Sequence, residues 1–241
     1  MRYLQYSSPF GLSGKRLASA LGLQASKHPP TGATICVSWG SPHAPAEALN
    51  GGIRVGKLFQ LETWKSADLS TLTFSRSPER GWLPRSGRSF GGRDFGGALA
   101  YSRYWTKPVE NVIAEFRVHV IRKPNTSGCS PAKFSVVRLG QKVNVDPSLN
   151  REVGGVQIRS RQFGWHLKYF GPSMRQTLTS LGDLDLQCRW ALSSLGWDFG
   201  AIDVLQTEQG FVLLEANSAP ALKDDATLKA YADRIKEIIG E

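Results

Sequence analysis

Apolar and polar residues alternate along several short segments of the chain, and this period of two is typical of β-strands. The pattern predicts strands over Thr34–Trp39, Phe116–Ile121, Phe134–Leu139, Ala201–Gln206 and Phe211–Asn217. Arg117 falls between two apolar neighbours, so we expect its side chain on the polar face of its strand. The last two strands are separated by a few residues only, which predicts an antiparallel hairpin.

Elsewhere, apolar residues recur at the three- and four-residue spacing of an amphipathic helix. The spacing predicts helices over Gly14–Leu23 with Ser13 as N-cap, over Lys57–Trp64, over roughly 180–195 with Gly196 at the C-terminal end, and from Asp224 or Asp225 onward. Because helices and strands are mixed along the chain and the late hairpin is antiparallel, the fold class is predicted to be α+β or mixed α/β.

The composition is that of an ordinary folded protein. The chain has 241 residues, of which 41% are hydrophobic and 21% charged. No apolar run approaches the roughly 20 residues that a membrane helix needs, and residues 1–11 lack the apolar segment of a secretory signal. The three cysteines are far apart and form no CxxC pair. We therefore expect a cytoplasmic protein without a disulfide framework or a zinc site.

The net charge of +10 is unevenly distributed. Residues 116–175 carry 11 basic and 2 acidic side chains, whereas residues 176–241 carry 5 and 11. A basic stretch of this kind is typical of a nucleic-acid surface or of a polyphosphate pocket, and the acidic stretch could hold the counter-metal of such a pocket. A solvated basic face is equally common, so charge alone does not decide.

The segment that carries the most chemical information is the predicted hairpin. If Glu208–Gly210 form a three-residue loop, the strand pairs are Thr207–Phe211, Leu205–Leu213 and Asp203–Glu215. Asp203, Glu215 and Asn217 then share one face of the ribbon.

Two carboxylates directly opposite each other repel unless something neutralises them. A hard divalent cation with oxygen ligands does so, and the Asn217 amide offers a third oxygen. The alternative is a solvated hairpin face with ordinary acidic residues. Leu205 and Leu213 are expected on the same face as the carboxylates, which indicates partial burial and favours the metal site.

GAIDVL followed by VLLEANSAPAL resembles the C-terminal signature of the ATP-grasp ligases, and the likeness covers most of the chain. The resemblance implies that Asp203, Glu215 and Asn217 bind the Mg²⁺ ions, with Mn²⁺ as a possible substitute, that bridge the ATP phosphates. Two positions depart from the family pattern: Ala221 replaces a turn glycine, and Ala201 stands where the D-alanine ligase branch has a catalytic arginine.

Segments further upstream are similar to the short phage-encoded and RimK-like members of the family. AEFRVHV, Ala114–Val120, resembles a strand whose arginine is Arg117, followed in the pattern by a strand lysine, Lys133, and by an arginine, Arg159. The resemblance implies that Arg117 and Arg159 are catalytic and that Lys133 binds ATP.

WLPRSGRSFGGRDFGG, Trp82–Gly97, resembles the strand and glycine-rich loop that cover the phosphates, with Arg85 in place of the usual lysine. The implied nucleotide-binding residues are Arg85, Gly91 and Gly92, together with Trp105 and Thr106 in the adenine-binding hinge.

The fold implied by the resemblance is the ATP-grasp fold, in which two α/β subdomains clasp the nucleotide. We expect a shortened N-terminal region over residues 1–50, a subdomain with the glycine-rich loop over 51–110 and a subdomain with the metal-binding hairpin over 111–241. The implied activity is ATP-dependent ligation of a small-molecule or peptide carboxylate to an amine or related nucleophile through an acylphosphate, with release of ADP and phosphate. A phage-encoded protein would act in the host cytoplasm.

A different class of function is a basic nucleic-acid-binding protein on an ATP-grasp scaffold. The arginines of residues 76–93 and the seven tryptophans could serve phosphate contacts and stacking. A ligase that acts on modified nucleic acid combines the two. The metal trio distinguishes them, because a binding module has no need for opposed carboxylates on a partly apolar face.

Overall fold

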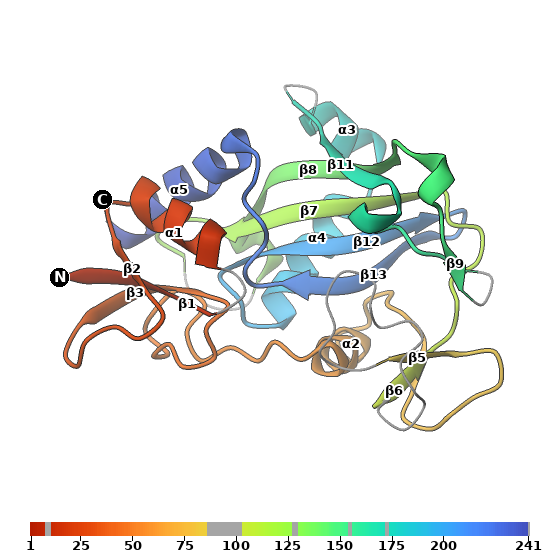
Figure 1. Ribbon diagram of the computed structural model, residues 1–241, viewed down its shortest axis with the longest axis horizontal. Coiled ribbons are helices and arrows are strands. Elements are labelled where there is room, and N and C mark those ends of the chain that lie inside the picture. Colours follow the sequence, from red (N-terminus) through yellow and green to blue (C-terminus); the bar gives the residue numbers. More distant parts are fainter. Residues whose placement is uncertain (8–10, 86–102, 127–129, 154–155, 172–173, 241) are drawn as a thin grey trace.

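A five-stranded antiparallel sheet forms the centre of the protein (Figure 1). The computed structural model describes residues 1–7, 11–85, 103–126, 130–153, 156–171 and 174–240. The strand order of the central sheet is β11-β8-β7-β12-β13. Its strands are β7 (Ala114–Arg122), β8 (Phe134–Asn144), β11 (Trp165–Tyr169), β12 (Phe199–Thr207) and β13 (Gly210–Asn217).

The N-terminal part forms a small parallel sheet of order β2-β1-β3 beside helix α1. Its elements are β1 (Arg2–Tyr6), α1 (Gly11–Ala20), β2 (Gln24–Ser26) and β3 (Thr34–Trp39). A third sheet of order β4-β6-β5 lies at the opposite end of the molecule (Figure 1). It consists of β4 (Phe74–Ser75), β5 (Leu83–Arg85) and β6 (Tyr104–Thr106).

Helices and short elements connect these sheets. The remaining helices are α2 (Lys57–Ser66), α3 (Met174–Ser180), α4 (Leu184–Ser194) and α5 (Asp225–Ile239). The short elements are the two-stranded ribbon of β9 (Glu152–Val153) and β10 (Val156–Gln157), and the 3-10 turns η2 (Pro131–Lys133), η3 (Pro147–Leu149) and η4 (Arg161–Phe163).

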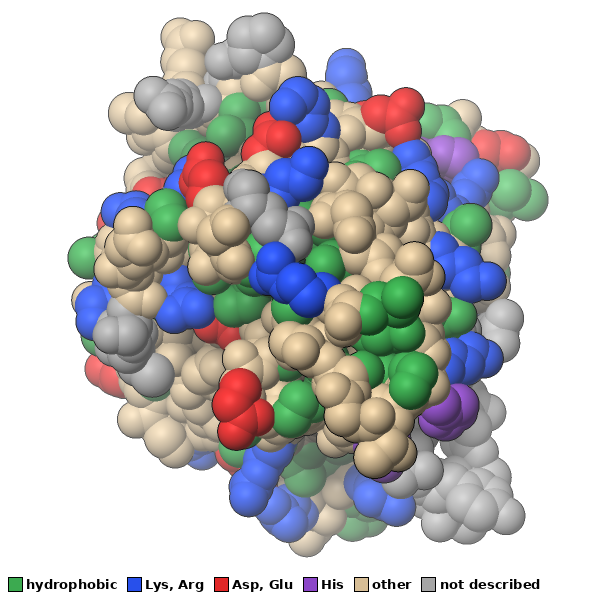
Figure 2. All heavy atoms as spheres, turned by 90° about the vertical axis from the view of Figure 1, so that its left-hand side faces the viewer, with side chains coloured by type: hydrophobic (Ala, Val, Ile, Leu, Met, Phe, Trp, Pro, Cys, Tyr) green, Lys and Arg blue, Asp and Glu red, His purple; other side chains and the backbone are tan. Residues whose placement is uncertain are grey.

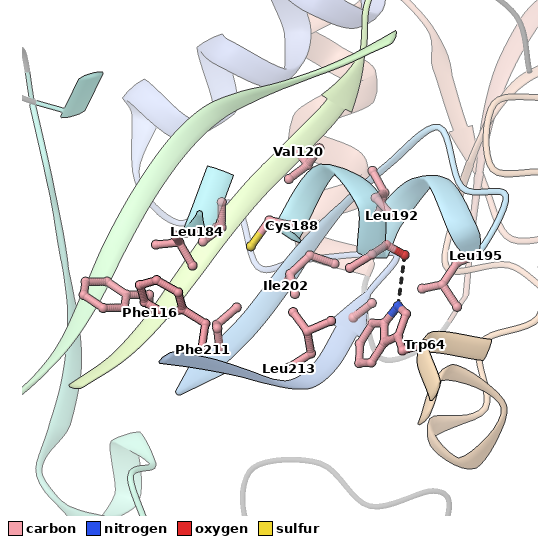
Figure 3. Packing of buried hydrophobic residues seen from close by; sticks show 14 of the residues in the cluster. Trp64, Phe116, Val120, Leu184, Cys188, Leu192, Leu195, Ile202, Phe211 and Leu213 are labelled. Carbon is pink, nitrogen blue, oxygen red and sulfur yellow. Dashed lines mark hydrogen bonds between the residues drawn. The ribbon is translucent and has the colours of Figure 1, made fainter. Parts of the chain in front are cut away.

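The larger core lies between one face of the central sheet and helices α2 and α4 (Figure 3). Phe116, Ile202 and Leu213 point from the strands toward Cys188 and Leu192 of α4. Within this core, the Trp64 indole of α2 donates a hydrogen bond to the Ala191 carbonyl at 3.0 Å. Alternation along each strand sends the next residue to the opposite face, so the packing of this core decides which side chains face the other way.

A second core joins the N-terminal sheet to α1, α5 and one end of the central sheet. Trp39 stacks on Phe199 with ring centroids 5.4 Å apart, and Tyr231 of α5 meets both rings edge-on. Arg16 of α1 donates to the Leu222 carbonyl at 2.6 Å. The N-terminal region is therefore packed firmly against the end of the hairpin strands.

Most of the predicted elements are present, and β3 has the predicted bounds. Asp224 is the N-cap of α5, where its side chain accepts a hydrogen bond from the Thr227 amide. The predicted N-cap Ser13 is wrong, because α1 begins at Gly11 and the Ser13 hydroxyl instead accepts from the Trp39 indole at 3.1 Å. The domain boundaries remain predictions.

Two observations concern the surface. Within the described ranges, every helix is too short or too polar to cross a bilayer. On the face formed by α1, α5 and the N-terminal sheet, lysines and arginines are scattered among acidic and apolar side chains and do not form one continuous patch (Figure 2).

Candidate active site

A cavity of about 1140 Å³ lies against the face of the central sheet that α2 and α4 do not cover. Residues from the central sheet, from the sheet of β4, β5 and β6, from the β9–β10 ribbon and from connecting segments line it. Those used below are Lys57, Arg85, Glu115, Arg117, Lys142, Arg159, Tyr169, Asp203, Leu205, Leu214, Glu215 and Asp224. The cavity combines apolar side chains with charged groups of both signs.

Strand alternation explains why the charges meet in this cavity. Glu115 and Arg117 alternate with the core residues Phe116 and Val118 of β7, so both point away from α4. The prediction that Arg117 lies opposite the apolar face is confirmed. The neighbouring strand β12 places Asp203 directly beside Arg117.

The predicted pairing of Asp203 with Glu215 is confirmed, but the predicted pairs Leu205–Leu213 and Thr207–Phe211, on the turn side of it, are wrong. Thr207 pairs with Gly210 and Val204 with Leu213, so the turn is one residue shorter than expected. A bulge between Asp203 and Val204 then accommodates one extra residue of β13 and restores the Asp203–Glu215 pair.

The bulge also changes which leucine lines the site. Leu214 lines the cavity beside Leu205, whereas Leu213 is fully buried in the larger core, contrary to the expectation that it shares the carboxylate face. The apolar side chains that share the cavity with the two carboxylates are therefore Leu205 and Leu214.

Asp203 forms a buried bidentate ion pair with Arg117. Arg117 Nε donates to Asp203 Oδ1 and Arg117 Nη2 donates to Asp203 Oδ2, each at 2.7 Å. Burial alone would raise the pKa of Asp203, but the Arg117 charge and hydrogen bonds outweigh it and lower that pKa. In the same way the Asp203 carboxylate overcomes the cost of burial and raises the pKa of Arg117. Both groups stay charged at neutral pH.

Glu215 has a different partner. Lys57 Nζ of α2 lies 2.7 Å from Glu215 Oε2. The Asn217 amide donates to Glu215 Oε1 at 3.4 Å, so the three residues of the predicted metal trio lie together at the end of the hairpin. Asn217 is half-buried but is not among the side chains that line the cavity.

A third ion pair joins Glu115 to Lys142 of β8. The Lys142 ammonium also donates to the Arg159 carbonyl at 2.9 Å. Burial raises the pKa of Glu115 despite the opposing charge of Lys142. Arg159 lies over the Trp165 ring at 5.1 Å and donates to the Val112 carbonyl, and burial lowers its pKa. The structure thus brings the two predicted catalytic arginines, Arg117 and Arg159, to one cavity.

The donor set at the hairpin fits a divalent cation that arrives with its own oxygen ligands. Two carboxylates and one amide meet there, and Mg²⁺ commonly takes one or two carboxylates with phosphate oxygens and water. Among the described residues, no group of three or more His, Cys, Asp or Glu side chains forms a metal cage. The protein residues alone therefore suit a metal–nucleotide complex better than a permanently bound ion.

Of the predicted nucleotide-binding residues, Arg85 lines the cavity and donates to the Thr106 hydroxyl at 2.9 Å. Thr106 is buried and does not line the cavity. Tyr104 lines the cavity, so alternation along β6 places Trp105 on the opposite face of the strand. Gly91 and Gly92 lie outside the described residues.

Lys133 is not where the pattern predicts it. It lies in the 3-10 turn η2 next to α4, where it is half-buried, and it does not line the cavity. The lysine on β8 that lines the cavity is Lys142, nine positions further on. The sequence interpretation missed Lys142 because β8 extends to Asn144, well beyond the predicted end at Leu139.

The cavity residues that the sequence reasoning missed include Lys57, Lys142, Glu115 and Tyr169. Glu115 could have been found from alternation, since it lies two residues before the cavity-facing Arg117, whereas Lys142 lies beyond the predicted end of its strand. Lys57 could not, because it begins a helix from a distant part of the chain.

This arrangement of sheets and helices is the ATP-grasp fold. Carboxyaminoimidazole ribonucleotide synthase from Aspergillus clavatus, solved with ATP, aligns with a TM-score of 0.64 at 12% identity, covering 100% of this chain and 77% of that one. N5-carboxyaminoimidazole synthetase from Staphylococcus aureus, solved with ADP, aligns with a TM-score of 0.62 at 11% identity and the same coverages. No protein-family model and no curated protein sequence matches the chain.

Proposed function

We propose that the protein is an ATP-dependent ligase that joins a carboxylate to an amine or related nucleophile and releases ADP and phosphate. The observation that carries the proposal is the opposed pair Asp203–Glu215 inside a cavity rich in cations, on the ATP-grasp fold. Carboxylates placed directly opposite each other repel, and the site holds a cation against each of them, Arg117 against Asp203 and Lys57 against Glu215. Similar folds were solved with ATP and ADP, which supports a nucleotide as the ligand here.

In the proposed reaction, a carboxylate oxygen of the substrate attacks the γ-phosphorus, the bond to the β–γ bridging oxygen breaks, and ADP leaves. The nucleophile then attacks the acylphosphate carbon, phosphate leaves, and an amine loses one proton. Mg²⁺ bound with the nucleotide would neutralise charge on the phosphates.

The chain's own residues position and neutralise the reacting groups. Asp203 and Glu215 would hold the metal with Asn217. Arg85, on the cavity wall, matches phosphate oxygens as a two-pronged donor. Arg117 and Arg159 would stabilise the negative charge that develops on the transferred phosphoryl group and on the tetrahedral intermediate, which is the main source of catalysis in phosphoryl transfer.

The test combines binding and turnover. We expect Mg²⁺–ATP or Mg²⁺–ADP to raise the melting temperature by a few degrees, because a ligand at 100 times its Kd adds about 2.7 kcal/mol to the free energy of unfolding. A panel of carboxylates and amines should reveal ADP release. Glu215→Gln should lower ADP formation by orders of magnitude, since the metal loses a charged ligand.

Glu208→Gln is the matched control. Glu208 is an exposed residue at the tip of the same hairpin, so its loss removes the same charge without touching the cavity. Equal effects of the two substitutions, or a melting temperature indifferent to Mg²⁺–ATP and Mg²⁺–ADP, would sink the proposal.

A further inference from the structure

Lys57 occupies a place that its own helix does not favour. It is the first residue of α2, which has no acidic residue in its first turn and no side-chain cap. A cation at a helix N-terminus is disfavoured by the helix dipole. The partner that compensates is Glu215 of β13, whose Oε2 lies 2.7 Å from Lys57 Nζ.

A buried glutamine fixes this meeting point. Gln60, one helical turn after Lys57, accepts a hydrogen bond from the Ala216 amide at 2.8 Å and donates one to the Ala216 carbonyl at 2.9 Å. Gln60 is 1% exposed. Because Ala216 directly follows Glu215, this double hydrogen bond holds the start of α2 against the carboxylate.

The ion pairs of the two opposed carboxylates differ in how easily they can be broken. Asp203 is 5% exposed and is held by both prongs of Arg117. Glu215 is 28% exposed and is held by one flexible ammonium and by a long hydrogen bond of 3.4 Å from the Asn217 amide. A partly exposed ion pair with the flexible ammonium of lysine is weaker than a buried bidentate pair with arginine.

We infer that Lys57 is a tethered counter-cation of Glu215 that a divalent cation must displace. This rests on the proposed function, since it assumes that Glu215 is a metal ligand. Lys57 neutralises the carboxylate when no metal is bound, and it lowers the affinity of the site for metal alone. Metal binding at Glu215 then requires the Lys57 ammonium to move off the carboxylate. The first turn of α2 therefore loses its ion pair with β13 when the metal binds.

The test measures Mn²⁺ binding by electron paramagnetic resonance on the full chain, with and without ADP. Lys57→Met should bind Mn²⁺ alone at least about threefold more tightly than the wild type, because the competing charge is gone. Lys57→Arg keeps the charge and should bind Mn²⁺ no more tightly than the wild type does. If the wild type binds too weakly to detect, detectable binding by Lys57→Met supports the inference, and none by either protein overturns it.

Lys65→Met is the matched control, because Lys65 lies on the same helix but contacts the Phe74 ring outside the cavity. A gain in affinity as large for this control as for Lys57→Met would mean a general effect of net charge and would overturn the inference. Unchanged Mn²⁺ affinity of Lys57→Met would do the same. Failure of the proposed function looks different: the wild type would then bind no Mn²⁺ even with ADP, or Asp203→Asn would bind it equally well.

Should Lys57→Met fail to fold, as judged by circular dichroism, Lys57→Gln is measured in its place with the same expected gain. Gln retains most of the side-chain volume and can still accept or donate a hydrogen bond at the helix start.

Discussion

At the scale of single residues, the hydrogen bonds of His119 fix its tautomer and its burial fixes its charge state. Tyr231 donates its hydroxyl proton to the Gly200 carbonyl at 3.1 Å, so toward His119 it can only accept, and Nδ1, 3.1 Å away, must carry the proton. Nε2 then accepts from the Tyr169 hydroxyl at 3.4 Å. His119 thus holds Tyr169 at the cavity wall.

Burial, helped by the positive charge of Arg117, lowers the pKa of His119 to about 3. The charged groups acting on the ring are Arg117, Arg138, Asp203 and Asp224, which come from β7, β8, β12 and the N-cap of α5. Between pH 6.5 and 3 the unfolded chain binds a proton here that the folded protein does not. The free energy of unfolding should therefore fall as the pH falls through this window, by up to about 1.4 kcal/mol per pH unit.

His119→Gln should remove that contribution. The slope of the free energy of unfolding against pH between 6.5 and 4 should then become shallower by up to about 1.4 kcal/mol per pH unit, which corresponds to one bound proton. Chemical denaturation at a series of pH values measures it. His28→Gln is the control, because His28 is exposed. An unchanged slope for His119→Gln would show that His119 is protonated in the folded protein.

Single residues also show where sequence reasoning succeeds. Arg117, Asp203 and Glu215 were placed correctly because strand alternation needs only local information. Lys133 was misplaced because the end of a strand depends on tertiary pairing, in this case of β8 with β7 and β11. The Lys57–Glu215 contact joins residues 158 positions apart and has no local signal in the chain.

At the scale of elements, the Gln60–Ala216 clamp ties α2 to β13. Gln60→Ala leaves the Ala216 amide and carbonyl buried without these partners, and each such group costs about 1–3 kcal/mol. We expect a loss of at least about 2 kcal/mol in the free energy of unfolding, measured with urea.

Gln176→Ala is the comparison, because Gln176 is an exposed glutamine on helix α3. A loss no greater than that of Gln176→Ala would mean that water or a rearranged side chain replaces both bonds of the clamp.

Elements were predicted better than their pairings. The hairpin strands, β7 and α5 all follow from periodicity and capping. The bulge at Leu214 of β13 could not be predicted, because the sequence around it has no glycine or proline that would indicate an irregular strand. The correct Asp203–Glu215 pair was obtained from a turn one residue too long, an error that the bulge compensates.

At the scale of the whole molecule, the uneven charge has a structural explanation. Basic residues of the segment 116–175 pair with acids of the segment 176–241: Arg117 with Asp203, Arg122 with Asp198 and Arg138 with Asp224. The two segments supply neighbouring parts of one sheet and its edge, so part of the excess charge is compensated inside the fold. This weakens the case for a nucleic-acid surface.

We therefore expect weak binding to a labelled DNA duplex, with affinity that changes less than tenfold between 50 and 200 mM salt. A protein that makes several phosphate contacts loses roughly 10³ or more over this range. Fluorescence anisotropy measures it, with EDTA present to exclude bridging metal. A steep decline that persists in EDTA would restore the nucleic-acid hypothesis. The resemblance to phage-encoded and RimK-like proteins remains a prediction at this scale.

The bulge in β13 has a consequence for how freely the hairpin can be altered. Beyond it, Glu215 is held by Lys57 and by the clamp on Ala216, and Asp203 is held by Arg117, so none of these contacts involves the tip. Hydrogen bonds within the tip hold it, such as that from Thr207 Oγ1 to the Gly210 carbonyl at 3.1 Å, and residues 208–210 are exposed. The tip is thus the natural point to graft a label or an extra loop, since exposed loop tips tolerate insertion and the carboxylates would keep their alignment.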